Sequence, residues 1–133
     1  MRDFGIDLFD QWTAMWNGEP ALAYKIMAPE FTLRYAQPGA DVYDDIHDPR
    51  ALATRITAHR DSAPGLRFEP QGEAVIEMDD TRTGFVAHPY GAEFSGPDGR
   101  TVSVSGTDIL RTVAGVITEV WSASGGRGGR SYY

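Results

Sequence analysis

Residues 101–124 read TVSVSGTDILRTVAGVITEVWSAS, and this stretch decides the fold class. Two runs rich in β-branched residues, 101–113 and 116–124, are separated only by Ala114-Gly115. Such runs are typical of strands, and a two-residue connection containing glycine joins antiparallel strands in a hairpin. The end of the chain therefore predicts a β-hairpin.

Two further strand-like runs precede this hairpin, at residues 66–78 and 83–94. Asp79-Asp80 separates them from each other, and Pro97-Asp98-Gly99 separates the second from residue 101. Short turn sequences between consecutive strands predict an antiparallel meander of four strands.

The first half of the chain has helical periodicity instead. Between Asp3 and Asn17 apolar residues recur every three or four positions, and a second short helix is predicted over 21–27, between Pro20 and Pro29. A strand is predicted over 31–35, and a third helix begins at Asp48-Pro49 and ends before 63–65. The order predicts an α+β fold: three N-terminal helices packed on a strongly curved, mixed or antiparallel β-sheet, forming a cone whose interior could hold a small ligand.

Composition limits the function classes. The chain has 133 residues, a formal charge of −7, no cysteine, and enough apolar residues (41%) for one core. The negative charge disfavours binding to nucleic acids or membrane surfaces, and no run of about 18 apolar residues predicts a membrane span. We expect one domain over residues 1–124, a flexible Gly/Arg-rich tail over 125–133, and a cytoplasmic location.

Local motifs resemble the nuclear-transport-factor-2-like superfamily. Trp16-Asn17-Gly18-Glu19 and Met27-Ala28-Pro29-Glu30-Phe31 resemble the start of this fold. Residues 106–111 (GTDILR) and 115–121 (GVITEVW) resemble the last two strands of its SnoaL-like, polyketide cyclase-like branch. The resemblance implies the cone-shaped fold and a homodimer formed through the outer face of the sheet.

Asp108 is the leading candidate for a catalytic residue. Alternation in the strand over 101–113 places it on the same face as Val104 and Leu110, where it is the only ionisable residue. Burial raises the pKa of a carboxyl group, which suits a general acid or base near neutral pH. A twist near Gly106 would instead turn Asp108 outward. The resemblance favours catalysis, because polyketide cyclases and ketosteroid isomerases carry an acid at the matching position.

Other family positions differ in this chain. Tyr35 stands where ketosteroid isomerases have their proton-shuttling aspartate, and their oxyanion tyrosine aligns near Gln11 or Trp12. The arginine that limonene-epoxide-hydrolase-like enzymes place two residues before the strand aspartate is Gly106 here. Steroid isomerisation and epoxide hydrolysis by those routes are therefore not expected. Tyr35 could position or polarise a substrate oxygen.

The three histidines have pKa values suited to proton transfer. His88 precedes Pro89 and Gly91, where a bulge could aim it into the cone, although a structural role is the alternative. His59 is predicted to lie at a helix boundary. His47 follows loop aspartates, which are more typical of solvated helix caps than of a metal site, so no metal is expected.

Aromatic side chains are the natural lining for a flat ligand. The predicted substrate-binding set is Trp12, Trp16, Tyr24, Tyr90 and Trp121. Arg55, Arg60 and Arg111 are interpreted as surface or ion-pairing residues.

The sequence thus predicts a small cofactor-independent enzyme that resembles SnoaL-like cyclases. It would transfer protons in a cyclisation, isomerisation or dehydration of a hydrophobic carbonyl compound, using Asp108, His88 and Tyr35. One alternative is a non-catalytic small-molecule-binding or dimerisation module. Another is a hydrolase or dehydratase that holds water between Asp108 and His88 or His47.

Overall fold

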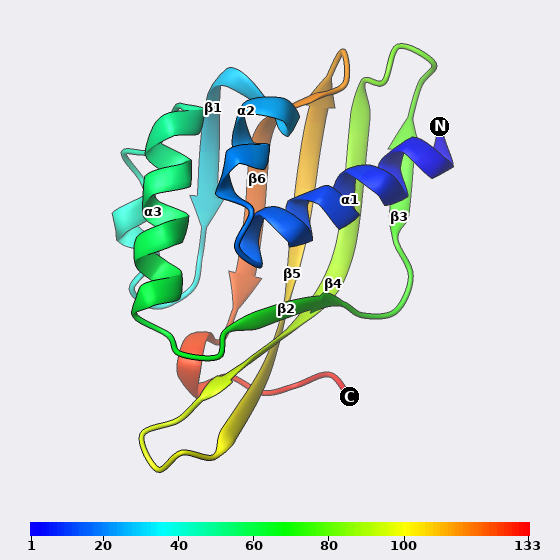
Figure 1. Ribbon diagram of the computed structural model, residues 1–133. Helices are drawn as coiled ribbons and strands as arrows, with labels where there is room; N and C mark the ends of the chain where they lie inside the picture. Colours follow the sequence, from blue (N-terminus) through cyan, green and yellow to red (C-terminus); the bar gives the residue numbers. More distant parts are fainter.

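The computed structural model describes residues 1–133 and places the helices on one face of a single sheet (Figure 1). The elements are α1 (Arg2–Trp16), η1 (Pro20–Leu22), α2 (Ala23–Ile26), β1 (Met27–Tyr35), η2 (Ala40–Tyr43), α3 (Pro49–Asp61), β2 (Arg67–Pro70), β3 (Val75–Met78), β4 (Gly84–Ser95), β5 (Thr101–Val113), β6 (Val116–Ser124) and η3 (Gly126–Gly128). This is the predicted α+β arrangement, and the predicted order is confirmed: one strand lies between the second and third helices, and the other strands follow the third helix.

The sheet has six strands in a mixed arrangement. Its order is β1-β6-β5-β4-β2, and β3 also pairs with β4. Only β1 runs parallel to its neighbour, β6, whereas the other pairs are antiparallel. The predicted turn at Ala114-Gly115 is confirmed: both residues have positive φ values, +50° and +88°, as a tight hairpin with the twist of its strands requires.

The single strand predicted over residues 66–78 is wrong, because the chain forms two strands there. β2 pairs with residues 90–93 of β4, and β3 pairs with residues 84–87 of the same strand. Pro70 has no N–H to continue the ladder, and Gly72 adopts φ +67°, which turns the chain. The long β4 strand thus has two short partners along one edge.

The first strand also differs from its prediction, since it begins at Met27 rather than residue 31. The short helix correspondingly ends at Ile26. Pro29 was expected to end a helix, but here it lies inside β1, an edge strand whose register shifts between Met27 and Thr32. An edge strand with a register shift can accommodate a residue that lacks a backbone donor.

The main core lies between the helices and the inner face of the sheet. α1 buries its predicted apolar stripe there, including Leu8, Trp12 and Met15. α3 begins as predicted, with the Asp48 carboxylate accepting a hydrogen bond from the Ala51 N–H at 2.9 Å. No helix combines the length and apolar character needed to cross a membrane.

The C-terminal segment after residue 124, which was expected to be flexible, crosses β5 and is hydrogen-bonded to it (Figure 1). The Ser105 N–H donates to the Arg130 carbonyl oxygen at 2.9 Å, and the Tyr132 N–H donates to Ser105 Oγ at 2.9 Å. The turn η3 precedes these contacts and carries Arg127 to the rim of the cavity between helices and sheet. The segment is therefore part of the wall of the domain.

Candidate active site

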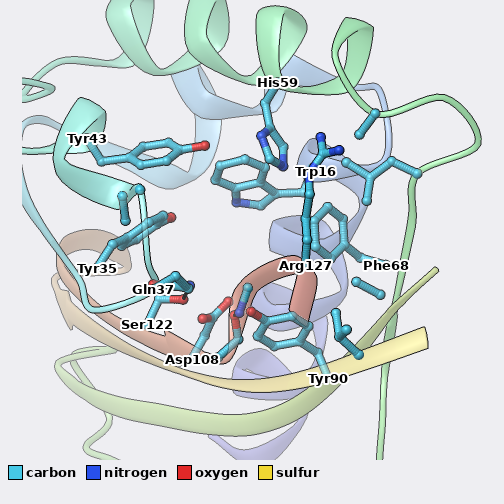
Figure 2. Close-up of a pocket in the computed structure, with 18 of the residues that line it drawn as sticks. Trp16, Tyr35, Gln37, Tyr43, His59, Phe68, Tyr90, Asp108, Ser122 and Arg127 are labelled. Atoms are coloured by element: carbon cyan, nitrogen blue, oxygen red, sulfur yellow. Dashed lines mark hydrogen bonds between the residues drawn. The ribbon is translucent and has the colours of Figure 1, made fainter. Parts of the chain in front are cut away.

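A cavity of about 660 Å³ lies between the helices and the inner face of the sheet. Such a volume is typical of sites that enclose a small organic ligand. Its lining is dominated by rings, with a few polar groups at defined positions (Figure 2). The aromatic lining residues are Phe9, Trp12, Trp16, Tyr35, Tyr43, His59, Phe68, Tyr90 and Phe94.

Four polar residues lie in register on four neighbouring strands and form one row across the sheet. Tyr35 on β1 is in register with Ser122 on β6, Ser122 with Asp108 on β5, and Asp108 with His88 on β4. Residues in register on neighbouring strands point to the same face. The parallel pairing of β1 with β6, which local patterns cannot reveal, brings Tyr35 into this row.

Asp108 is buried, with 7% of its surface exposed, and it faces the cavity. Burial raises the pKa of its carboxyl group from 3.8 to about 6, while the neighbouring Ser122 hydroxyl and the Trp12 indole limit the rise. Trp12 Nε1 donates to Asp108 Oδ2 at 2.9 Å, and Oδ1 has no hydrogen-bond partner. One carboxylate oxygen is thus held by the protein and the other is free to accept a proton.

Two phenols accompany this carboxylate. Tyr35 and Tyr90 lie on either side of Asp108 at the same end of the cavity (Figure 2). Burial, reinforced by the Asp108 charge, raises the pKa of Tyr90 to about 12 and that of Tyr35 well above 10. Both side chains therefore remain neutral near pH 7 and can donate an O–H to an oxygen atom of a ligand.

The opposite end of the cavity is positively charged. His59 and the Arg127 guanidinium lie there beside Trp16, away from Asp108 (Figure 2). Burial lowers the pKa of His59, and the charges of Arg127, Arg55 and Arg60 lower it further. The cavity is therefore polarised along its length, with a carboxylate at one end and cationic groups at the other.

Comparison with known proteins identifies the fold. A proposed polyketide cyclase from Acidithiobacillus ferrooxidans superposes with a TM-score of 0.74 at 17% identity, over 91% of this chain and 87% of that one. A proposed SnoaL-like isomerase from Agrobacterium tumefaciens gives 0.65 at 21% identity, over 93% and 99%. IdmH, a proposed polyketide cyclase from Streptomyces antibioticus, gives 0.72 at 17% identity, over 90% and 91%.

The chain has the SnoaL-like fold. The resemblance inferred from short motifs is thereby confirmed at the level of the fold. No protein-family model and no curated protein sequence matches the chain. What a SnoaL-like domain does depends on the residues of its cavity, because one fold hosts many chemistries.

Several sequence-predicted residues meet in the cavity of this SnoaL-like domain. Asp108 lies on the inner face as predicted, so the alternative with an outward-turned side chain is wrong. Tyr35 also points inward, whereas Arg34 points out and pairs with Glu119. Trp12, Trp16 and Tyr90 line the cavity too.

His88 is buried on the inner face but does not line the cavity. Its ring stacks on Phe9, with centroids 4.8 Å apart, and Nδ1 lies 2.7 Å from the Pro89 carbonyl oxygen. Phe9 lines the cavity, whereas His88 does not. The structure therefore gives His88 packing and backbone contacts in place of the predicted contact with a ligand.

Two predicted substrate-binding residues lie elsewhere. Tyr24 is 61% exposed on α2, and Trp121 lies on the outer face of β6 beside Phe85, with ring centroids 6.3 Å apart. His47 is also remote from the cavity, with Nδ1 3.0 Å from the Phe31 carbonyl oxygen. None of these three residues lines the cavity.

Sequence reasoning missed the cationic end of the cavity. Arg55 was interpreted as a surface residue and His59 as a boundary residue, yet both line the cavity. The signal was present, because Arg55 and His59 follow Leu52 and Ile56 on the same helical face. Arg127 carried no comparable signal, since its position depends on how the C-terminal segment folds back on β5.

Proposed function

We propose that this protein is a cofactor-independent enzyme that removes a proton from a carbon next to a carbonyl group of a small aromatic substrate. The observation that carries the proposal is Asp108: a buried carboxyl group with a pKa of about 6, facing an aromatic cavity, with Oδ1 unpartnered. A base that accepts a proton near neutral pH needs such a group.

The reaction follows from the groups around Asp108. The carboxylate oxygen Oδ1 takes the proton from the substrate carbon, and the electron pair of the C–H bond moves toward the carbonyl oxygen to give an enolate. The neutral phenol of Tyr35 or Tyr90 donates a hydrogen bond to that oxygen. The protonated Asp108 then returns the proton to another carbon of the conjugated enolate. In the ring-closing case the enolate carbon instead attacks a second carbonyl in the same molecule, and the alkoxide formed there takes the proton from Asp108.

The nature of the structural neighbours supports this chemistry. They include proposed polyketide cyclases and a proposed SnoaL-like isomerase. Cyclisation and isomerisation of a carbonyl compound can both begin with the enolate that this site would form. Hydrolysis or dehydration through water held by Asp108 and a histidine finds less support, because His88 and His47 do not line the cavity and His59 lies at its other end.

Proton transfer can be tested without knowing the natural substrate. We expect the protein to accelerate deuterium incorporation next to the carbonyl of 2-tetralone in buffered D₂O, measured by proton NMR. Because the carboxylate is the active form, the rate should rise with pH, reach half its maximum near the Asp108 pKa of about 6, and level off above it.

The control is Asp80→Asn, which removes an exposed carboxylate in the turn before β4 and should leave the rate unchanged. No acceleration by the wild-type protein with 2-tetralone, 1-tetralone or anthrone would contradict the proposal. An exchange rate that is the same in Asp108→Asn as in the wild type would also contradict it. Retained ligand binding without any exchange would favour the non-catalytic binding module.

We also propose a homodimer formed through the outer face of the sheet. Phe85, Ile109 and Trp121 lie together on this face, since Ile109 is in register with Trp121 and the Phe85 and Trp121 rings approach each other. Phe85 is 41% exposed and adjoins Trp121, and it is contiguous apolar patches of this kind that mark interaction sites. Arg111 and the Arg34–Glu119 ion pair border the apolar centre, as in many subunit interfaces.

If the protein is a dimer, light scattering at micromolar concentration should give a mass of about twice 14.6 kDa. Trp121→Arg should reduce it to the monomer mass, because an arginine at the centre of an apolar interface has no partner there. Tyr24→Arg, at an exposed aromatic on α2, is the matched control and should leave the mass unchanged. A wild-type monomer under these conditions would overturn the dimer.

A further inference from the structure

We propose that the ligand of this cavity carries an anionic group, such as a carboxylate, which binds between Arg55, His59 and Arg127 at the end remote from Asp108. This inference rests on the proposed function, which places the carbonyl part of the ligand at Asp108 in the same cavity. It adds the substrate class: a flat aromatic carbonyl compound with an acidic substituent.

The first observation is unused hydrogen-bonding capacity. Arg55 Nε is buried in the cavity wall and has no hydrogen-bond partner. A buried donor without a partner is costly, and an acceptor on a bound ligand would remove that cost. Arg127 donates through Nη2 to the Ser62 carbonyl oxygen at 3.2 Å and lies 5.5 Å from the Phe94 ring centroid, which holds the guanidinium at the cavity rim.

The second observation is missing countercharge. The ion pairs of the molecule involve Arg34, Arg67, Arg100 and Arg111, and none involves Arg55 or Arg127. Asp108 is the only acidic residue that lines the cavity. In a chain with 19 acidic and 12 basic residues, two arginines that line one cavity without an ion-pair partner are unexpected on composition alone.

The arginines also act on His59, whose pKa is lowered first by burial and then by the charges of Arg127, Arg55 and Arg60. His59 is therefore neutral near pH 7, and the arginines hold the positive charge at this end of the cavity. An anion placed among these groups would balance that charge and give Arg55 an acceptor. Arginine suits this role because its planar guanidinium can donate two parallel hydrogen bonds to a carboxylate.

The geometry also sets the orientation of the ligand. Asp108 and the Arg127 guanidinium lie at opposite ends of the cavity, with the Trp16 ring between them (Figure 2). An aromatic ligand lying against Trp16 would therefore place its reactive carbon at Asp108 and its acidic group at the arginines. Like charge would disfavour the reverse orientation, because the acidic group would then lie beside the Asp108 carboxylate.

Two probes that differ only in charge can test the inference. Anthraquinone-2-carboxylate and anthraquinone-2-carboxamide can be titrated at pH 7.5 by quenching of tryptophan fluorescence, since Trp12 and Trp16 line the cavity. We expect the carboxylate to bind at least about tenfold more tightly than the carboxamide, as charge-assisted hydrogen bonds predict. Arg55→Met and Arg127→Met should each reduce that preference while leaving the affinity for the carboxamide within about twofold.

Arg50→Met is the matched control, because Arg50 is an exposed residue of the same helix, α3, and should leave both affinities unchanged. If Arg55→Met does not fold, Arg127→Met on the C-terminal segment carries the test alone. Equal binding of the two probes by the wild-type protein, absence of binding, or a preference that survives in the arginine variants would overturn the inference. Asp108→Asn should keep the preference while losing deuterium exchange, which separates failure of this inference from failure of the proposed reaction.

Discussion

Replacing Asp108 by asparagine is expected to stabilise the protein at pH 8 while removing its activity. The pKa of this carboxyl group is raised from 3.8 to about 6 by burial, so the folded protein disfavours the ionised form. This pKa difference corresponds to about 3 kcal/mol at pH values above both pKa values. Asparagine is neutral and nearly the same size, and its side-chain oxygen can still accept the hydrogen bond from Trp12.

The pH dependence gives the sign of this effect. Between pH 4 and pH 6 the folded protein binds more protons than the unfolded chain, because its Asp108 has the higher pKa. The contribution of Asp108 to the free energy of unfolding therefore falls as pH rises through this range and stays low above it. Asp108→Asn lacks this decline, so the variant and the wild type should be similarly stable near pH 4 and diverge by pH 8.

The same substitution removes the proposed base. A positioned general base contributes on the order of 10²–10⁴ in rate, so deuterium exchange into 2-tetralone should fall by about that factor. Urea denaturation at pH 4 and pH 8, with Asp80→Asn as control, measures the stability half of the prediction. A variant less stable than wild type at pH 8 would mean that the carboxylate is stabilised by its surroundings, contrary to the raised pKa.

The parts of the fold that depend on neighbouring residues alone could be predicted from local sequence patterns. The hairpin at Ala114-Gly115 and the helix capped by Asp48 needed only turn chemistry and periodicity. The split of residues 66–78 was missed because it depends on which half of β4 each piece contacts. The parallel pairing of β1 with β6 was beyond local reasoning, since the partners are separated by most of the chain.

The residues of the candidate site also differ in whether local patterns could place them. Alternation within one strand was enough to place Asp108 inside, because a one-residue error would have exposed its apolar neighbours as well. His88 was on the predicted face, yet the Phe9 ring from α1 covers it, and no pattern within β4 contains that information. Arg127 reaches the cavity only because the C-terminal segment returns to β5.

Trp12→Phe is expected to destabilise the protein more at pH 8 than at pH 4, by about 1–2 kcal/mol. The Trp12 indole provides the hydrogen bond to Asp108 Oδ2 at 2.9 Å, and phenylalanine keeps an aromatic ring without that donor. A hydrogen bond to a charged group contributes about 1.5–3 kcal/mol, against roughly 1 kcal/mol for a neutral pair. The loss should therefore be larger where Asp108 is ionised. The smaller ring also leaves a cavity, whose cost is the same at both pH values.

Loss of this donor should also raise the pKa of Asp108 further, because the hydrogen bond from Trp12 favours the charged form. The pH at which deuterium exchange reaches half its maximum should therefore move upward in Trp12→Phe. Trp16→Phe is the matched control for the exchange profile: Trp16 also lines the cavity, but its indole makes no hydrogen bond to Asp108, so the pH of half-maximal exchange should not move.

The double variant separates the indole–carboxylate contact from the packing of the ring. In the Asp108→Asn background no charge remains to be stabilised, so Trp12→Phe should cost the same at pH 4 and pH 8. A pH-dependent cost that persists in that background would mean that another ionisable group responds to Trp12. An unshifted exchange profile in the single variant would mean that the Trp12 donor does not act on the proton-accepting carboxylate. If both expectations hold, Trp12 sets the pH range of the base by holding one of its oxygen atoms while the other has no partner within the protein.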